Sequence, residues 1–212
     1  ISYSGCAAQV FFFYVFGAAD LALLTVMAYD RYIAICKPLH YKTIMKETTC
    51  ICMAVSMWLS CIPYSALHTG SIFHLSCKSN IIDHLFCEVP QLLKLSCSDS
   101  SFNEVVVLIF SFHLVFTCFA FISMSYVQIF TMIFRISVKE TQRKAFSTCI
   151  PHLIVVSIFV STGSFACLKP VSKSPSALDL IASLLYSMLP PVINPVIYIM
   201  RNNDIKAAIQ KL

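Results

Sequence analysis

The chain has 212 residues, of which 58% are hydrophobic and 12% are charged, with a formal net charge of +5. Soluble domains carry roughly 25% charged residues, so this chain has too little polar surface for a soluble enzyme, a disordered tail or a nucleic-acid binder. The mean hydropathy of +0.79 indicates a membrane protein instead.

Apolar segments long enough to cross a membrane recur along the chain. A bilayer core of about 30 Å needs roughly 20 mainly apolar residues per helix. Backbone amides cannot stay unpaired in lipid, so such segments must be helical. The sequence therefore predicts an all-α membrane protein in which residues 1–212 form part of one transmembrane domain. The expected spans are 6–29, 50–68, 105–134, 145–168 and 177–200.

The connections between these spans differ in character. The one at 31–49 is basic, and the one at 69–104 is long and holds three cysteines. The connection at 135–144 is short, which makes the third and fourth spans antiparallel neighbours. After the last span, residues 202–212 are expected to form a short helix on the membrane surface. Its apolar stripe consists of Ile205, Ala208, Ile209 and Leu212.

Lys and Arg residues are distributed unevenly between the two sides of the predicted topology. Eleven of the 15 follow the first, third and fifth spans, and the other four are Lys78, Lys94, Lys169 and Lys173. Cytoplasmic flanks carry the excess of Lys and Arg. We therefore expect the first span to enter from outside and the C-terminus to lie in the cytoplasm.

Four of the 11 cysteines fall on the predicted outer side, where disulfides persist. They are Cys6, Cys77, Cys87 and Cys97. Spacing alone leaves all three pairings open. The other seven are interpreted as small apolar packing groups, and Cys50 with Cys52 lacks the second ligand pair of a metal site.

Several strings closely resemble the signatures of olfactory receptors, in the same order along the chain. They are MAYDRYIAICKPLHY at 27–41, HLFC at 84–87, LLKLSCSD at 92–99, Ser125-Tyr126, KAFSTCIPHL at 144–153, and PPVINPVIY at 190–198 followed by Arg201-Asn202. The resemblance implies that the five spans are helices three to seven of a seven-helix bundle, with helices one and two not represented.

The resemblance implies an odorant receptor rather than an enzyme, without a cofactor, in the plasma membrane. Its partners would be a small, volatile, neutral and hydrophobic ligand and a heterotrimeric G protein of the olfactory or stimulatory class. The resemblance also pairs Cys6 with Cys87 and Cys77 with Cys97.

The cytoplasmic coupling residues are carried over from the family motifs. For Arg31 alone, a positive-inside membrane anchor is the alternative, but within this string the resemblance favours contact with the G protein. The implied set is Asp30, Arg31, Tyr32, Tyr126, Lys144, Asn194, Pro195 and Tyr198.

A ligand cavity is implied in the outer half of the bundle, apolar with a few hydroxyls and no charge. The residues at that depth are Phe13, Tyr14, Gly17, Ala18, Phe110, Ser111, Leu114, Val160, Gly163, Ser164, Leu184 and Ser187. Ordinary helix packing is the alternative for about half of them. Asp20, the one carboxylate deep within a span, is either an intramembrane ion site or a protonated packing residue. His113 and His152 are interpreted as packing groups rather than metal ligands.

Two other functions stay open as alternatives. The chain could be a non-signalling fragment or pseudogene product of the same family. It could also be part of a transporter, which is less favoured because no internal repeat is found.

Overall fold

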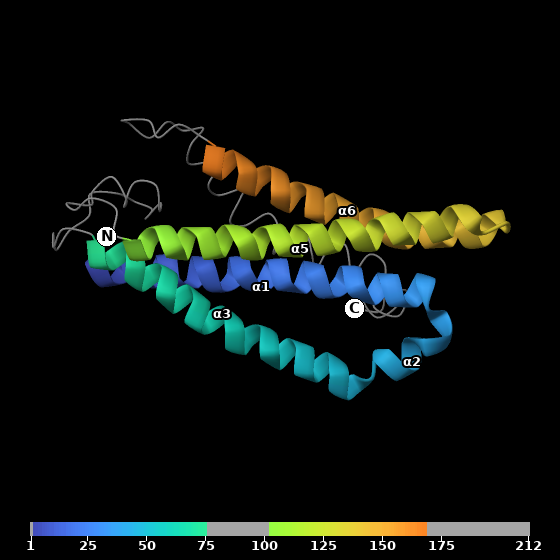
Figure 1. The fold of residues 1–212 in the computed structure, drawn as a ribbon, viewed down its shortest axis with the longest axis horizontal. Coiled ribbons are helices and arrows are strands. Elements are labelled where there is room, and N and C mark those ends of the chain that lie inside the picture. Colours follow the sequence, from blue (N-terminus) through green and yellow to red (C-terminus); the bar gives the residue numbers. More distant parts are fainter. Residues whose placement is uncertain (1, 76–101, 169–212) are drawn as a thin grey trace, which may run out of the picture. The chain divides into compact units, whose positions relative to one another are not determined.

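The computed structural model describes residues 2–75 and 102–168, which form helices in chain order (Figure 1). Four of these helices are long and apolar enough to cross a membrane. The prediction of an all-helical membrane protein is confirmed. The elements are α1 (Tyr3–Cys36), the 3₁₀ turn η1 (Pro38–His40), α2 (Tyr41–Ile44), α3 (Glu47–Leu75), α5 (Phe102–Arg135) and α6 (Lys139–Leu168). The fifth predicted span, 177–200, and the surface helix at 202–212 lie outside the described residues.

Helix α1 extends beyond the predicted span at both ends. It begins at Tyr3, where the Ser2 hydroxyl accepts a hydrogen bond from the Gly5 amide at 3.2 Å. It ends at Cys36 because Pro38 cannot continue the helix and restricts the residue before it. The prediction of a loop from residue 31 onward is therefore wrong for 31–36. The polar residues from Arg31 onward end the apolar stretch on which the prediction was based, but a helix can continue through polar residues.

The chain divides into two compact units, Ile1–Met132 and Ile133–Leu212. In the first unit, α1 and α3 run antiparallel and meet near the start of α1, then diverge towards α2 (Figure 1). At the meeting end, the Tyr3 hydroxyl donates a hydrogen bond to the Phe73 carbonyl at 3.0 Å, and the two rings pack edge to face. Next to this pair, Cys6, Val10 and Ile72 form a buried cluster.

Small side chains line the next contact between α1 and α3. Ala19 is buried against Met57 and Cys61, with Ala18 and Ala22 packed beside them. In a membrane no hydrophobic force drives helices together, so close approach at small residues provides the packing energy. This alanine contact therefore positions α3 against the middle of α1.

Helix α5 contacts both partners within the first unit. Its Ser111 side chain hydrogen-bonds to His68 of α3, and its Phe121 ring lies 6.2 Å from the Tyr29 ring of α1. Much of its remaining surface is apolar and exposed, as at Phe112 and Phe116. Such a surface suits a helix that faces lipid.

The second unit contains the tight turn between α5 and α6. Only residues 136–138 connect the two helices, so the predicted connection at 135–144 is shorter than expected. The turn is fixed by edge-to-face packing of Phe134 on Phe146 and by a 3.3 Å hydrogen bond from the Gln142 side chain to the Ile133 carbonyl. Helix α6 includes Pro151 in its interior.

Candidate functional site

The Asp30-Arg31-Tyr32 motif lies in the last two turns of α1. Arg31 is buried, with 6% of its surface exposed, whereas Asp30 and Tyr32 are half-buried. The Tyr41 hydroxyl, at the start of α2, donates a hydrogen bond to Asp30 Oδ1 at 2.8 Å. The connection that follows α1 is therefore tied back onto the motif by a charge-assisted bond.

Tyr41 is kept protonated by the same arrangement. The hydrogen bond to Asp30 raises the pKa of Tyr41 above its ordinary value, and partial burial and the nearby Asp30 and Cys50 charges add to the shift. A phenol ionises only above about pH 10 even without such help. The hydroxyl thus donates to Asp30 throughout the physiological range.

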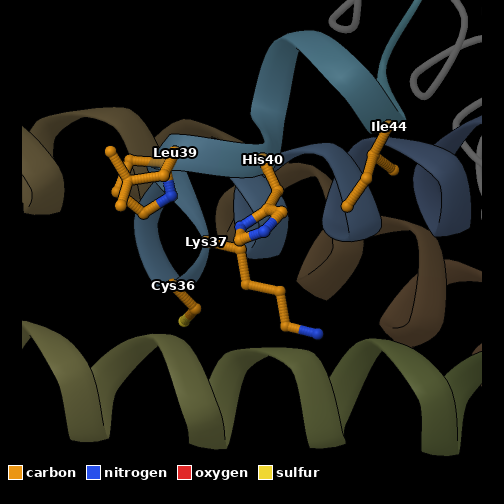
Figure 2. Close-up of a pocket in the computed structure, with 6 residues that line it drawn as sticks. Cys36, Lys37, Leu39, His40 and Ile44 are labelled. Carbon is orange, nitrogen blue, oxygen red and sulfur yellow. The ribbon is translucent and has the colours of Figure 1, made fainter.

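The residues between α1 and α2 frame a shallow hollow of about 450 Å³. Figure 2 shows Leu39 and Ile44 at opposite ends of the hollow with His40 between them. Leu39 is 93% exposed, the largest exposed fraction among the large hydrophobic side chains of the described residues. Lys37 Nζ lies 5.8 Å from the centre of the Tyr32 ring, a cation–π contact. This end of α1 offers an exposed apolar side chain among basic residues.

Two further predicted coupling residues lie in described helices. Tyr126 of α5 is buried, and its ring packs 5.9 Å from that of Phe130. It lies five residues beyond Phe121, the residue that contacts Tyr29 near the end of α1. Lys144 of α6 is exposed and forms a 3.1 Å ion pair with Glu140 one turn before it. Asn194, Pro195 and Tyr198 lie outside the described residues.

Within the first unit, two of the predicted ligand residues, Tyr14 and Ser111, meet at a third side chain. The Tyr14 ring of α1 stacks on His68 of α3, with ring centres 4.5 Å apart. His68 hydrogen-bonds to Ser111 of α5 and also contacts Tyr64, whose ring centre lies 4.6 Å away. Three helices therefore bring a compact aromatic and polar cluster together.

Of the other predicted ligand residues in the described helices, Phe13 packs edge to face on Tyr14, with ring centres 5.9 Å apart, and the rest do not join this cluster. Phe13, Gly17 and Ala18 are half-buried on α1, and Ala18 packs against the alanine contact with α3. A Cβ added at Gly17 would meet no atom within 4 Å, so space remains beside it. The exposed members are Phe110, Leu114 and Val160. The surroundings of Gly163, the side chain of Ser164, and all of Leu184 and Ser187 lie outside the described part.

The remaining predicted groups are placed as follows. Asp20 is half-buried in α1 and makes no hydrogen bond or ion pair within the described residues. Cys6 is disulfide-bonded, and the described cysteines that form no disulfide are Cys36, Cys50, Cys52, Cys61, Cys118 and Cys149. Cys77, Cys87 and Cys97 lie outside the described residues. In the described helices, no three His, Cys, Asp or Glu side chains gather as a metal site.

Two packing predictions have different outcomes. Cys61 and Cys149 are buried, but Cys50 and Cys52 at the start of α3 are exposed, so the packing prediction is wrong for that pair. His152 is buried in α6, whereas His113 is exposed on α5. Cys50 and Cys52 lie in the first turns of α3, where this helix has diverged from α1 (Figure 1).

Comparison with known proteins covers the whole chain. The family model described as olfactory receptor matches residues 1–212. Human olfactory receptor 14I1 is 48% identical over all of this chain and 68% of its own length. Human olfactory receptor 14C36 and mouse olfactory receptor 1E16 are 46% and 44% identical, each again over 68% of its length. The chain belongs to the olfactory receptor family.

Olfactory receptors are receptors rather than enzymes, in keeping with four apolar helices and a multi-pass membrane protein. Within this olfactory receptor, sequence reasoning missed two residues of the aromatic and polar cluster, Tyr64 and His68. A signal for His68 was present. Cys61, Ser65, His68 and Ile72 recur at helical spacing and are the buried face of α3. A histidine on such a face must contact a neighbouring helix.

Proposed function

We propose that this protein is an odorant receptor. It binds a small, neutral and mostly hydrophobic ligand between the outer halves of its helices. It then activates a heterotrimeric G protein of the olfactory or stimulatory class on the opposite side of the membrane. Membership in the olfactory receptor family supports this activity.

One structural observation carries the coupling half of the proposal. A buried arginine lies at the end of a membrane-length helix, beside a carboxylate that the next segment holds by a 2.8 Å hydrogen bond. A partner that contacts this end can compete for these contacts. Leu39, exposed in the same segment, adds an apolar group for such a partner to cover. Tyr126, Lys144, Asn194, Pro195 and Tyr198 belong to the same proposal through the family motifs.

The proposed orientation places the coupling end in the cytoplasm. The basic residues Arg31, Lys37, Lys42 and Lys46 follow α1, and the positive-inside rule assigns such flanks to the cytoplasm. The C-terminus then also lies inside. The ends where α1 begins and α3 finishes face the outside, where ligand arrives.

The coupling role is tested with Arg31→Ala in the full-length receptor. We expect odorant-driven cyclic-nucleotide production to be lost while surface expression is retained, because the motif contacts the G protein rather than the ligand. Lys46→Ala, at an exposed basic residue of the same connection, is the matched control and should keep its response. A normal response from Arg31→Ala at equal surface expression would show that this residue is only an anchor.

We also propose that Cys6 pairs with Cys87 and Cys77 with Cys97. Cys6 is disulfide-bonded, and its partner is not among the described cysteines that form no disulfide. This supports the first pairing. A second bridge closing about twenty residues would stabilise the loop by roughly 3 kcal/mol on chain-entropy grounds. Peptide mapping of the non-reduced receptor should recover both pairs. A peptide that joins Cys6 to Cys77 would contradict the assignment.

A further inference from the structure

The outer cluster consists of Tyr14, Tyr64, His68 and Ser111, contributed by α1, α3 and α5. His68 has only 4% of its surface exposed. The Tyr14 ring is nearly parallel to the imidazole, at an interplanar angle of 24°, and the Tyr64 ring is tilted by 56°. The imidazole is thus enclosed by two aromatic rings and bonded to a hydroxyl of a third helix.

The hydrogen bonds determine which atom of His68 carries a proton. The Ser111 hydroxyl has one hydrogen, and it is donated to the Val107 carbonyl at 2.7 Å. We therefore assign the accepting role in its contact with His68 Nε2 to the Ser111 oxygen. His68 consequently bears its proton on Nε2 and presents an N–H donor in the outer half of the bundle.

A donor of this kind is unusual in a membrane helix. Polar side chains within the bilayer face the bundle interior and mark sites of function more often than surface residues do. The next residue of α3, Thr69, has a buried hydroxyl without a hydrogen-bond partner in the described residues. The outer part of α3 therefore holds more hydrogen-bonding capacity than its packing uses.

The space beside the cluster and its lack of charge limit which ligands could bind to these hydrogen-bonding groups. Gly17 lies one turn along α1 from Tyr14 and leaves open space beside it. The nearest carboxylate of α1 is Asp20, six residues or about 9 Å along the helix axis from Tyr14. No formal charge adjoins the cluster among the described residues, so a charged ligand would find no counter-ion there.

We propose that α3 supplies the polar end of the ligand site. The Nε2–H of His68 donates to an oxygen of a neutral ligand, such as an aldehyde, ketone or ester, while Tyr14 and Tyr64 pack against the adjoining carbon chain. This inference rests on the proposed odorant-receptor function and deepens it, because it selects oxygen-bearing ligands over hydrocarbons. The predicted pocket residues include none from α3.

Ser111 competes with the ligand in this arrangement. In the structure the His68 N–H is already engaged, so a ligand oxygen must replace the Ser111 oxygen as acceptor. Removing that oxygen should free the donor and favour the ligand. The two partners of one hydrogen bond therefore have opposite expected effects, which a purely structural bond between α3 and α5 would not produce.

The experiment compares five forms of the full-length receptor in a cyclic-nucleotide assay. They are the wild type, His68→Phe, His68→Gln, Ser111→Ala and the control His113→Phe, which alters an exposed histidine on α5. His68→Phe keeps an aromatic ring between the tyrosines but has no N–H. The probes are octanal, 2-octanone and the hydrocarbon octane, each of which has eight carbon atoms. Surface expression of each form is measured in parallel.

We expect an oxygen-bearing probe to activate the wild type and octane not to. His68→Phe should raise the half-maximal effective concentration of that probe about tenfold, because one hydrogen bond to the probe is lost. Ser111→Ala should lower it, and His113→Phe should leave it unchanged. His68→Gln, which restores an N–H donor, should recover part of the potency.

The contrary outcomes separate the two proposals. A wild type that responds to octanal while His68→Phe responds equally would overturn the role of His68 and leave receptor function intact. Equal losses in His68→Phe and Ser111→Ala would assign the bond to structure alone. A wild type that reaches the surface and responds to no probe would count against the proposed function and this inference together.

Discussion

Tyr41 links the segment after α1 to the end of that helix through one hydroxyl group. The bond to Asp30 is 2.8 Å long, and both residues remain partly accessible. A hydrogen bond to a charged group is stronger than a neutral one, but solvent weakens it where the partners are exposed. The hydroxyl is therefore a modest constraint placed next to the buried Arg31.

Tyr41→Phe tests this constraint because it removes the hydroxyl and keeps the ring. We expect the free energy of unfolding of the full-length receptor to fall by about 1 kcal/mol. Thermal unfolding of the purified protein measures the effect. Tyr29→Phe, which changes a tyrosine whose described contacts are made by its ring, is the matched control and should leave the melting temperature unchanged.

The raised pKa of Tyr41 determines how the stability difference between wild type and Tyr41→Phe depends on pH. The folded protein holds the phenolic proton more tightly than the unfolded chain does. The stabilisation is therefore complete below the ordinary tyrosine pKa of about 10 and is lost as pH rises through the higher folded value. The difference between wild type and Tyr41→Phe should stay constant from about pH 6 to about pH 9. A difference that disappears within that range would point to another group.

At the scale of helices, the contact between α1 and α3 depends on a small side chain. Ala19 is 4% exposed and packs on Met57 and Cys61. Ala19→Leu would force extra atoms into this contact and should cost about 1–3 kcal/mol. Ala8→Leu, on an exposed part of the same helix, is the control, since lipid is as apolar as leucine. Equal thermal stability of the two variants would show that the alanine contact is loose.

Hydrophobicity predicted where helices cross the membrane better than where they end. Apolar windows locate the lipid-covered part, but α1 continues to Cys36 because a helix needs no lipid to persist and stops only near Pro38. The family motifs pointed to Asp30 and Arg31, yet not to Tyr41 as their partner. That bond depends on the turns of η1 and α2, which no apolar pattern encodes.

The outer cluster shows a second limit of sequence reasoning. Tyr14 and Ser111 were predicted at ligand depth, but His68 was not, although it is the side chain that joins them. The periodic buried face of α3 places His68 against a neighbouring helix, but it does not say which side chains His68 meets there. Its significance arises from the crossing of three helices, which is a property of packing rather than of spacing along one segment.

For the whole molecule, the proposed orientation makes a prediction about thiols. Cys50 and Cys52 are free and exposed at the start of α3, on the side proposed to be cytoplasmic. A membrane-impermeant maleimide should label them only after cells are permeabilised. The added labelling should disappear in the Cys50→Ser/Cys52→Ser double variant. Labelling of intact cells that this double variant abolishes would reverse the orientation.

The length of α1 has a consequence for the receptor's passage between organelles. Its apolar residues 6–29 are about 36 Å long at 1.5 Å per residue. The hydrocarbon layer is about 27 Å thick in the endoplasmic reticulum and about 32 Å in the plasma membrane. Residues 6–29 are therefore longer than either layer, and the excess to be taken up by tilting, kinking or local thickening of the bilayer is larger in the first. Because the Tyr3–Phe73 bond and the Ala19 contact hold α3 to α1, we expect any change of tilt to involve both helices together if the receptor travels to the plasma membrane.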